Sequence, residues 1–200
     1  MSYIEEYLGE VQRVAGGLDH ATIEKMIDLL LDIRKRNGRL FFLGVGGGAG
    51  NASHAVNDFR KIAGIESYTP CDNISELTSR INDEGWETVF IEWLKVNRLN
   101  RNDGVFIFSV GGGDAERKIS ANLVRALEYA KEVGAKILAI VGRDGGYAAQ
   151  VGDACLIIPT VNPNAITPHT ESFQSVIWHL IVSHPKVKVS EMKWESIREG

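Results

Sequence analysis

The chain of 200 residues is long enough for one domain with a well-formed core and short for two. Its 22 basic and 26 acidic side chains are spread along the sequence and leave a net charge of −4, which excludes a basic nucleic-acid or membrane-binding block. Cys71 and Cys155 have neither metal-site nor redox-motif spacing and are typical of reduced thiols. The polar N-terminus is no signal peptide, and no apolar run approaches the roughly 20 residues of a membrane span. We therefore expect a cytoplasmic protein.

Helical and extended patterns follow one another along the chain. Apolar residues at helical spacing predict two N-terminal helices, over residues 1–15 and 21–37. Short apolar runs then predict buried strands, over 40–45, 104–110, 136–141 and 154–158, with a weaker one over 66–70. Further helices are expected over 51–63, 115–133 and 167–183, the last with Thr167 as N-cap and Pro168 in its first position.

The repeated order of strand, glycine turn and helix predicts the architecture. It indicates an α/β fold, a three-layer doubly wound parallel sheet preceded by N-terminal helices. No linker divides the chain, so one domain over 1–200 is expected, with a charged and loosely held tail over 186–200.

Two glycine turns mark the expected ligand edge of this sheet. The first contains Gly46, Gly47 and Gly48, and the second contains Gly111, Gly112 and Gly113. Glycine lets the backbone approach an anion closely, and each following helix N-terminus offers free N–H groups. Tight turns also use glycine without any ligand, but two at equivalent places favour a bound phosphate or sugar. Neither turn is a dinucleotide fingerprint or a P-loop.

Histidines and carboxylates occur at helical spacing near these turns. His54 and Asp58 lie four residues apart on one helix face, and Glu171 and His179 lie eight apart, about 12 Å along the axis of the last helix. These side chains suit a divalent metal with an open coordination position. Each side chain also has an ordinary interpretation. His54 and Asp58 would be a pair on the helix surface, Glu171 a carboxylate at a helix N-terminus, and His179 a core histidine.

The motifs together resemble those of the sedoheptulose 7-phosphate (phosphoheptose) isomerases of the sugar-isomerase (SIS) family. The segment from Gly44 to Asp58 is similar to the family's Gly-Asn-Gly-Gly-Ser-Ala-Ala-Asp-Ala-Gln-His run, with Asp58 in place of the usual Glu. Residues 71–75 and 82–86 resemble two further motifs, and residues 142–146 match the turn Gly-Arg-Asp-Gly-Gly. In the last helix, Glu171 takes the place of a family Gln, eight residues before His179.

The resemblance implies an activity and a set of site residues. The activity is metal-dependent aldose–ketose isomerisation of sedoheptulose 7-phosphate to D-glycero-D-manno-heptose 7-phosphate through an enediol. The implied ligands of a divalent metal such as zinc are His54, Asp58, Glu171 and His179. Asp58 and His179 would share the acid–base work, with the division between Asp58 and Glu171 open, and His169 is a further candidate. Substrate-binding positions would be Gly46, Gly47, Gly48, Asn51, Asp72, Ser109, Gly111, Gly112, Gly113 and Asp114.

One turn departs from the family. Val110, Gly111 and Asp114 stand where hydroxyl residues that hold the sugar phosphate are expected, and the Asp114 charge would repel a nearby phosphate. Asp114 is also expected to be a helix N-cap. Backbone N–H groups with Arg117 or Lys118 could compensate, or the ligand is not phosphorylated there.

Two other interpretations stay open: an isomerase or epimerase of another sugar phosphate, and a non-catalytic SIS protein that senses sugar phosphates or resembles the replication-initiator-associating protein. The family also implies a homotetramer, with residues 1–37 at the subunit interface.

Overall fold

A parallel sheet of five strands lies at the centre of the computed structural model, which describes residues 2–197. The strands are β1 (Leu40–Gly44), β2 (Ser67–Tyr68), β3 (Gly104–Ser109), β4 (Lys136–Val141) and β5 (Ala154–Ile157). Their order across the sheet is β2-β1-β3-β4-β5, with Leu40 opposite Gly104 and Gly104 opposite Lys136. This is the doubly wound order of flavodoxin-like folds and confirms the predicted fold class.

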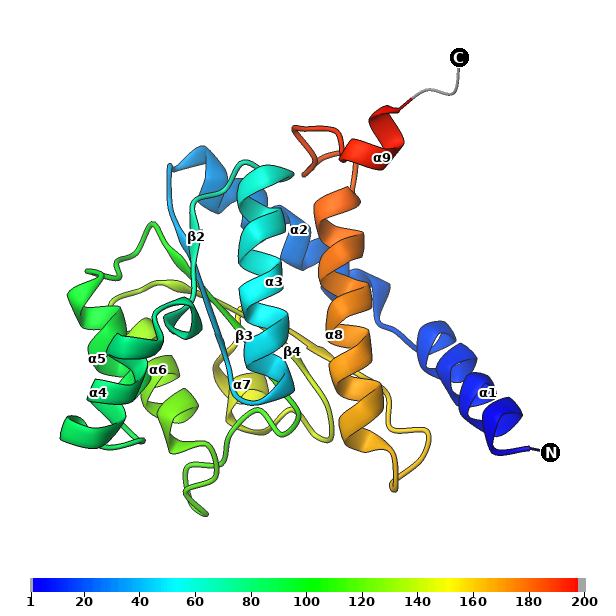
Figure 1. Ribbon diagram of the computed structural model, residues 1–200, viewed down its shortest axis with the longest axis horizontal. Helices are drawn as coiled ribbons and strands as arrows, with labels where there is room; N and C mark the ends of the chain where they lie inside the picture. The colour runs from blue at the N-terminus through cyan, green and yellow to red at the C-terminus, as the bar shows by residue number, and fades with distance from the viewer. Residues whose placement is uncertain (1, 198–200) are drawn as a thin grey trace.

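Helices cover both faces of the sheet, so the domain has three layers (Figure 1). Phe42 and Phe106 pack against one layer, whereas their strand neighbours Phe41 and Val105 pack against the other, as side chains alternate along a strand. The first layer contains α2 (His20–Lys35), α3 (Gly47–Lys61) and α8 (Ile166–Ser183). The second contains α4 (Ile74–Glu84), α5 (Val89–Val96), α6 (Ala121–Glu132) and α7 (Gly146–Val151).

The first helix, α1 (Tyr3–Gly16), extends away from the sheet (Figure 1). It begins with a capping box in which Ser2 and Glu5 satisfy each other's backbone N–H groups. Its inner face carries Glu10, which is 3% exposed and contacts His169 of α8 at 2.7 Å. A buried polar pair thus attaches α1 to the domain.

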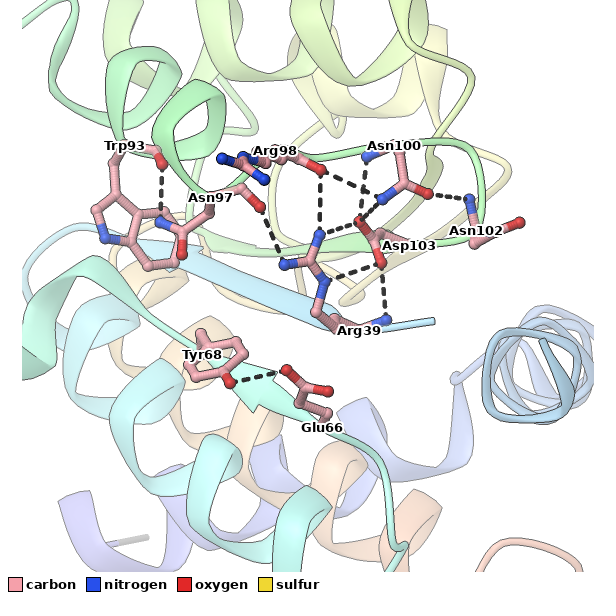
Figure 2. Close-up of polar contacts among 9 residues, drawn as sticks. All are labelled: Arg39, Glu66, Tyr68, Trp93, Asn97, Arg98, Asn100, Asn102 and Asp103. Carbon is pink, nitrogen blue, oxygen red and sulfur yellow. Dashed lines mark hydrogen bonds and ion pairs between the residues drawn. The ribbon is translucent and has the colours of Figure 1, made fainter. Parts of the chain in front are cut away.

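A second polar cluster fixes the edge of the sheet where β1 and β3 begin (Figure 2). Asp103 is 2% exposed and accepts hydrogen bonds from the Arg39 backbone N–H at 2.9 Å and from its Nη2 at 2.8 Å. The Arg39 guanidinium also donates to the carbonyl oxygens of Asn97 and Arg98. The Asp103 carboxylate raises the pKa of Arg39 and keeps it charged. This cluster lies at the amino ends of the strands, far from the expected ligand edge.

Two predicted helix starts are wrong, for different reasons. Helix α3 begins at Gly47 rather than 51, because Gly46 adopts a φ of 59° and turns the chain directly from β1 into the helix. Helix α6 begins at Ala121 rather than 115, because Asp114 and Ile119 exchange two backbone hydrogen bonds in a short hairpin. Asp114 therefore caps no helix; its carboxylate accepts from the Arg117 N–H at 2.8 Å within this hairpin.

The C-terminal part of the chain also differs from expectation. Helix α8 begins at Ile166 with Ala165 as N-cap, so Thr167 and Pro168 are its second and third residues. Proline fits there because the first four N–H groups of a helix make no hydrogen bond within it. Within the tail, Val187 is fully buried and the Val189 N–H donates to the carbonyl of Ile62, so the tail is held at least there. The short helix α9 (Lys193–Ser196) follows. The helices α4, α5 and α7 and the 3₁₀ helix η1 (Pro70–Asp72) were not predicted.

Within residues 2–197, no helix is both long enough and apolar enough to span a bilayer.

Both cysteines are free thiols. Burial raises the pKa of Cys155 to about 11, so this thiol stays protonated at neutral pH.

Candidate active site

The strand order creates a crevice between β1 and β3. The connections after these two strands lead to opposite faces of the sheet, and ligands of doubly wound proteins bind at such switch points. A cavity of about 300 Å3 lies there. Its lining comes from the ends of β1, β3 and β4, from the segment before α6, and from α3 and α8: Val45, Gly48, Ser109, Val110, Gly111, Ile119, Ser120, Arg143, Glu171 and Gln174. We refer to it below as the switch-point cavity.

The first glycine turn is packed closely against α8. A β-carbon added at Gly47 would overlap the Glu171 carboxylate, and one added at Gly48 would overlap the carbonyl of Phe108. The carboxylate of Glu171 therefore lies at the N-terminus of α3, where the helix dipole favours negative charge. The sequence predicts a substrate anion near this helix end, and the structure places the protein's own carboxylate there.

Hydrogen bonds with Ser109 and α7 hold the second glycine turn in place. The N–H of Gly112 donates to Ser109 Oγ at 3.1 Å, while the carbonyls of Gly112 and Gly113 accept from the backbone N–H groups of Ala148 and Tyr147 in α7. Asp114, 3.8 Å from Arg117 Nε, lines a neighbouring cavity of about 360 Å3 rather than the switch-point cavity. Asp114 is therefore not expected to repel a phosphate bound in the crevice.

Helices α3 and α8 lie side by side and run in the same direction (Figure 1). Asn51 joins them: its Nδ2 donates to the carbonyl of Glu171 and to Gln174 Oε1, both at 3.0 Å. Both hydrogens of this amide are used within the protein, so only Oδ1 of Asn51 remains for a substrate.

Further along the same two helices, three of the predicted metal ligands come together. Asp58 Oδ2 lies 3.9 Å from His54 Nε2 and 3.8 Å from His179 Nε2. One ligand atom from each of the three residues lies within 4.8 Å of the others. Four residues separate His54 from Asp58, which places them on one face of α3, opposite His179 of α8. Distances of this size leave room for an ion between the three side chains.

Neighbouring groups orient these ligands. The Nδ1 of His179 lies 2.8 Å from the carbonyl oxygen of Ser175 and must donate to it, since a carbonyl can only accept. In the neutral imidazole the lone pair is then on Nε2, which faces Asp58. Asn57 Nδ2 donates to Asp58 Oδ1 at 2.8 Å, which leaves Oδ2 for the cluster. Trp178 packs edge-on against His54, with 4.7 Å between ring centroids. The donor set and its orientation fit a divalent metal of the zinc type.

Glu171 is not part of this cluster. Its side chain lies over Gly47, as described above, because helical side chains point toward the helix N-terminus and hence away from His179. Eight residues of helix, about 12 Å, separate the two. Of the four metal ligands predicted from the family resemblance, the structure thus brings together three.

Two other candidates have structural partners. Asp72 Oδ1 accepts a hydrogen bond from Ser53 Oγ at 2.6 Å, which places Asp72 beside α3 but outside the lining of the switch-point cavity. His169 is 3% exposed, pairs with Glu10 and stacks on Tyr7 at 4.7 Å. It supports α1 and does not reach the site.

Several residues of the site were not singled out from the sequence, including Ile119 and Ser120 in the cavity wall. Gln174 and Trp178 have the periodicity of core residues on α8 and gave no separate signal. Arg143 belongs to the Gly-Arg-Asp-Gly-Gly turn. A charged residue between turn glycines at the end of a predicted strand is a candidate for ligand binding, and this signal could have identified it.

The switch-point cavity and the histidine–aspartate cluster define an α/β domain suited to a small polar ligand and a metal. Comparison with known proteins identifies the family. The SIS domain family model matches residues 2–142, and the chain belongs to the SIS domain family.

Individual relatives point to isomerases. A lincomycin biosynthesis protein of Streptomyces lincolnensis is 31% identical over 195 residues, which cover 92% of this chain and 69% of that protein. A phosphoheptose isomerase of Helicobacter pylori (strain P12) is 26% identical over 184 residues, covering 88% of this chain and 90% of the relative. The solved structure of phosphoheptose isomerase from Neisseria gonorrhoeae superposes with a TM-score of 0.78 at 22% identity, covering 90% and 96% of the two chains, and shows the same fold. The phosphoheptose isomerases among the sequence relatives support an isomerase enzyme.

Proposed function

We propose that this protein is a metal-dependent isomerase that converts sedoheptulose 7-phosphate to D-glycero-D-manno-heptose 7-phosphate. The observation that carries the proposal is the cluster of His54, Asp58 and His179, with a free Nε2 on His179, on the two helices that also line the switch-point cavity. The name of several relatives, phosphoheptose isomerase, supports the choice of substrate.

The three clustered side chains would hold the metal, and zinc suits their nitrogen and oxygen atoms. When bound, such an ion polarises a substrate carbonyl and stabilises the negative charge that develops on its oxygen. Glu171 remains available for a second task, because its carboxylate faces the cavity and has no hydrogen-bond partner among residues 2–197.

Isomerisation between a ketose and an aldose moves one proton between adjacent carbons and another between their oxygens. A base removes the proton from the carbon next to the carbonyl to give the enediol, and the same proton returns to the former carbonyl carbon. We assign these transfers to Asp58 and His179. The single lone pair of His179 Nε2 binds either the metal or a proton, so His179 would take part in proton transfer only while its Nε2 is released from the metal. The Ser175 carbonyl would then stabilise the imidazolium through Nδ1.

The switch-point cavity would bind the rest of the sugar. Its wall combines backbone at Gly48 and Gly111 with the hydroxyls of Ser109 and Ser120. A cavity of about 300 Å3 matches the lower end of small-molecule sites.

The proposal extends to assembly and location. We propose a cytoplasmic homotetramer in which α1 contributes to the subunit contacts. In support, Tyr3, Ile4 and Leu8 of α1 are 77%, 68% and 56% exposed, which leaves an apolar helix surface uncovered in the single chain.

The test is turnover of sedoheptulose 7-phosphate by the purified protein, followed by phosphorus NMR. We expect an aldoheptose phosphate to appear, chelator to abolish its formation, and added zinc to restore it. Asp58→Asn and His179→Gln should each lower kcat by about 100-fold or more. Full turnover by either variant would contradict the assignment of its residue.

A second candidate is isomerisation or epimerisation of a different sugar phosphate. It is favoured by Val110 and Gly111, which line the cavity where the family carries hydroxyl side chains. A panel of ketose and aldose phosphates of five to eight carbons, assayed with metal-loaded protein, separates the two. Faster turnover of another sugar would replace the heptose phosphate as substrate.

A further inference from the structure

Arg143 is a cation that lines the candidate site. It comes two residues after the end of β4, is exposed, and lines both the switch-point cavity and the neighbouring cavity beside the 114–119 hairpin. Within residues 2–197 its guanidinium makes no hydrogen bond or ion pair. By contrast, Arg39 and Arg80 are tied to carboxylates.

The backbone at Arg143 is unfavourable for a residue with a β-carbon. Its φ is 53°, in the left-handed region, within a tight turn closed by a hydrogen bond from the Gly145 N–H to the Gly142 carbonyl at 3.0 Å. Glycine adopts this conformation without steric cost and is the usual residue at such a position. A non-glycine residue held there costs free energy of folding, and residues of this kind cluster at functional sites.

We propose that Arg143 binds the phosphate of the substrate, beside a second glycine turn that lacks hydroxyl side chains at three positions. This inference rests on the proposed function and adds to it the residue that recognises the phosphate. A guanidinium offers paired N–H donors to phosphate oxygens, which neither Val110 nor Gly111 can provide. Ser109 and Ser120 line the same cavity and would supply further donors.

The distribution of charge around the cavity supports this assignment. The carboxylate of Glu171 lies at the N-terminus of α3, on the wall formed by the first glycine turn, and repels a phosphate there. Asp114 does not line the switch-point cavity and lies beside Arg117. The switch-point cavity therefore has one cationic residue, Arg143, and the substrate would bind with its phosphate toward β4 and its other end toward α3 and α8.

The experiment compares Arg143→Gly, Arg143→Lys and Arg117→Gln with the wild type. Arg117 is a matched control, because it lines only the neighbouring cavity and is 75% exposed at its side chain. Binding of inorganic phosphate and of sedoheptulose 7-phosphate is measured by titration calorimetry, and KM and kcat by the isomerase assay. Thermal unfolding is measured in parallel.

We expect Arg143→Gly to weaken binding of both phosphate ligands and to raise KM about 10- to 100-fold, the effect of losing a hydrogen-bonded ion pair. Its melting temperature should equal or exceed that of the wild type, because glycine relieves the left-handed strain. Arg143→Lys should retain part of the binding and Arg117→Gln all of it. Unchanged phosphate binding in Arg143→Gly, or an equal loss in Arg117→Gln, would overturn the inference.

The two proposals fail in distinguishable ways. If Arg143→Gly loses phosphate binding but the wild type turns over no heptose phosphate, the phosphate site stands and the proposed substrate is wrong. If the wild type isomerises the sugar and the glycine variant has the same KM, the proposed function stands and the role of Arg143 is rejected.

Discussion

His179 Nδ1 and the carbonyl oxygen of Ser175 lie 2.8 Å apart, one turn of α8 from each other. This hydrogen bond holds the imidazole in the tautomer whose Nε2 lone pair faces Asp58 and His54. The helix backbone thus orients the imidazole of a proposed metal ligand, with Ser175 Oγ also 3.4 Å from Nδ1, and these contacts restrain rotation of the ring.

Removal of either histidine should abolish tight metal binding. We expect His54→Ala and His179→Ala to bind zinc more than about 100-fold more weakly than the wild type, whereas His20→Ala, at the start of α2, should bind it normally. Metal content after dialysis and quenching of Trp178 fluorescence by Co2+ are suitable measurements, since this indole contacts both histidines. Normal zinc content in either cluster variant would show that the metal is held elsewhere.

Glu171→Gln tests whether this carboxylate is a metal ligand. Because Glu171 lies over Gly47 and apart from the cluster, we expect the variant to retain full zinc content. The family resemblance places a ligand at this position, and a large loss of zinc would show that Glu171 turns toward His179 when metal binds. Asp58→Asn, assayed by the same dialysis, serves as the positive control for metal loss.

Asp103→Ala should destabilise the fold strongly. It removes the acceptor of the Arg39 guanidinium and leaves that cation half-buried without its partner, at a cost of about 3 kcal/mol. Asp32→Ala, which breaks an exposed pair with Arg36, should cost less than about 1 kcal/mol. Urea unfolding monitored by circular dichroism measures both values, and similar losses in the two variants would contradict the importance of burial.

Acid should weaken the attachment of α1. The hydrogen bond from His169, supported by Asn162 and by the charges of His169 and Arg13, lowers the pKa of Glu10 below its ordinary value of 4.5. An acid whose pKa is lower in the folded state stabilises the fold above its unfolded-state pKa, and this stabilisation is lost as the pH falls through the lowered value.

We therefore expect the melting temperature to fall as the pH is lowered below about 4.5, and Glu10→Gln to flatten this fall. The variant should also be less stable at pH 7. Glu24→Gln, at an exposed residue 3.8 Å from Lys186, is the control and should follow the wild type. Identical pH profiles for Glu10→Gln and wild type would show that the pair does not stabilise the fold.

The parts that could be predicted from the sequence are those that depend on local pattern. Buried strands such as 104–109 have continuous apolar runs, and the spacing of His54 and Asp58 places both on one helix face. The position of Glu171 could not be predicted in this way, because it depends on how closely Gly47 lets α8 approach α3. The 114–119 hairpin could not be predicted for a similar reason. Its residues favour a helix, but Asp114 and Ile119 exchange two backbone hydrogen bonds, and Lys118 and Ser120 adopt φ values of 55° and 50°.

The parallel packing of α3 and α8 sets where the two ends of a substrate would bind and how far apart those ends would lie. The cluster around Asp58 lies on the two helices that the Asn51 amide joins, and Arg143 lies in the turn after β4 at the switch-point cavity. A sugar that reaches both must carry a set number of carbons between its carbonyl and its phosphate. The helix pair would therefore measure the chain of the substrate, and shorter or longer homologues would satisfy one end of the site only.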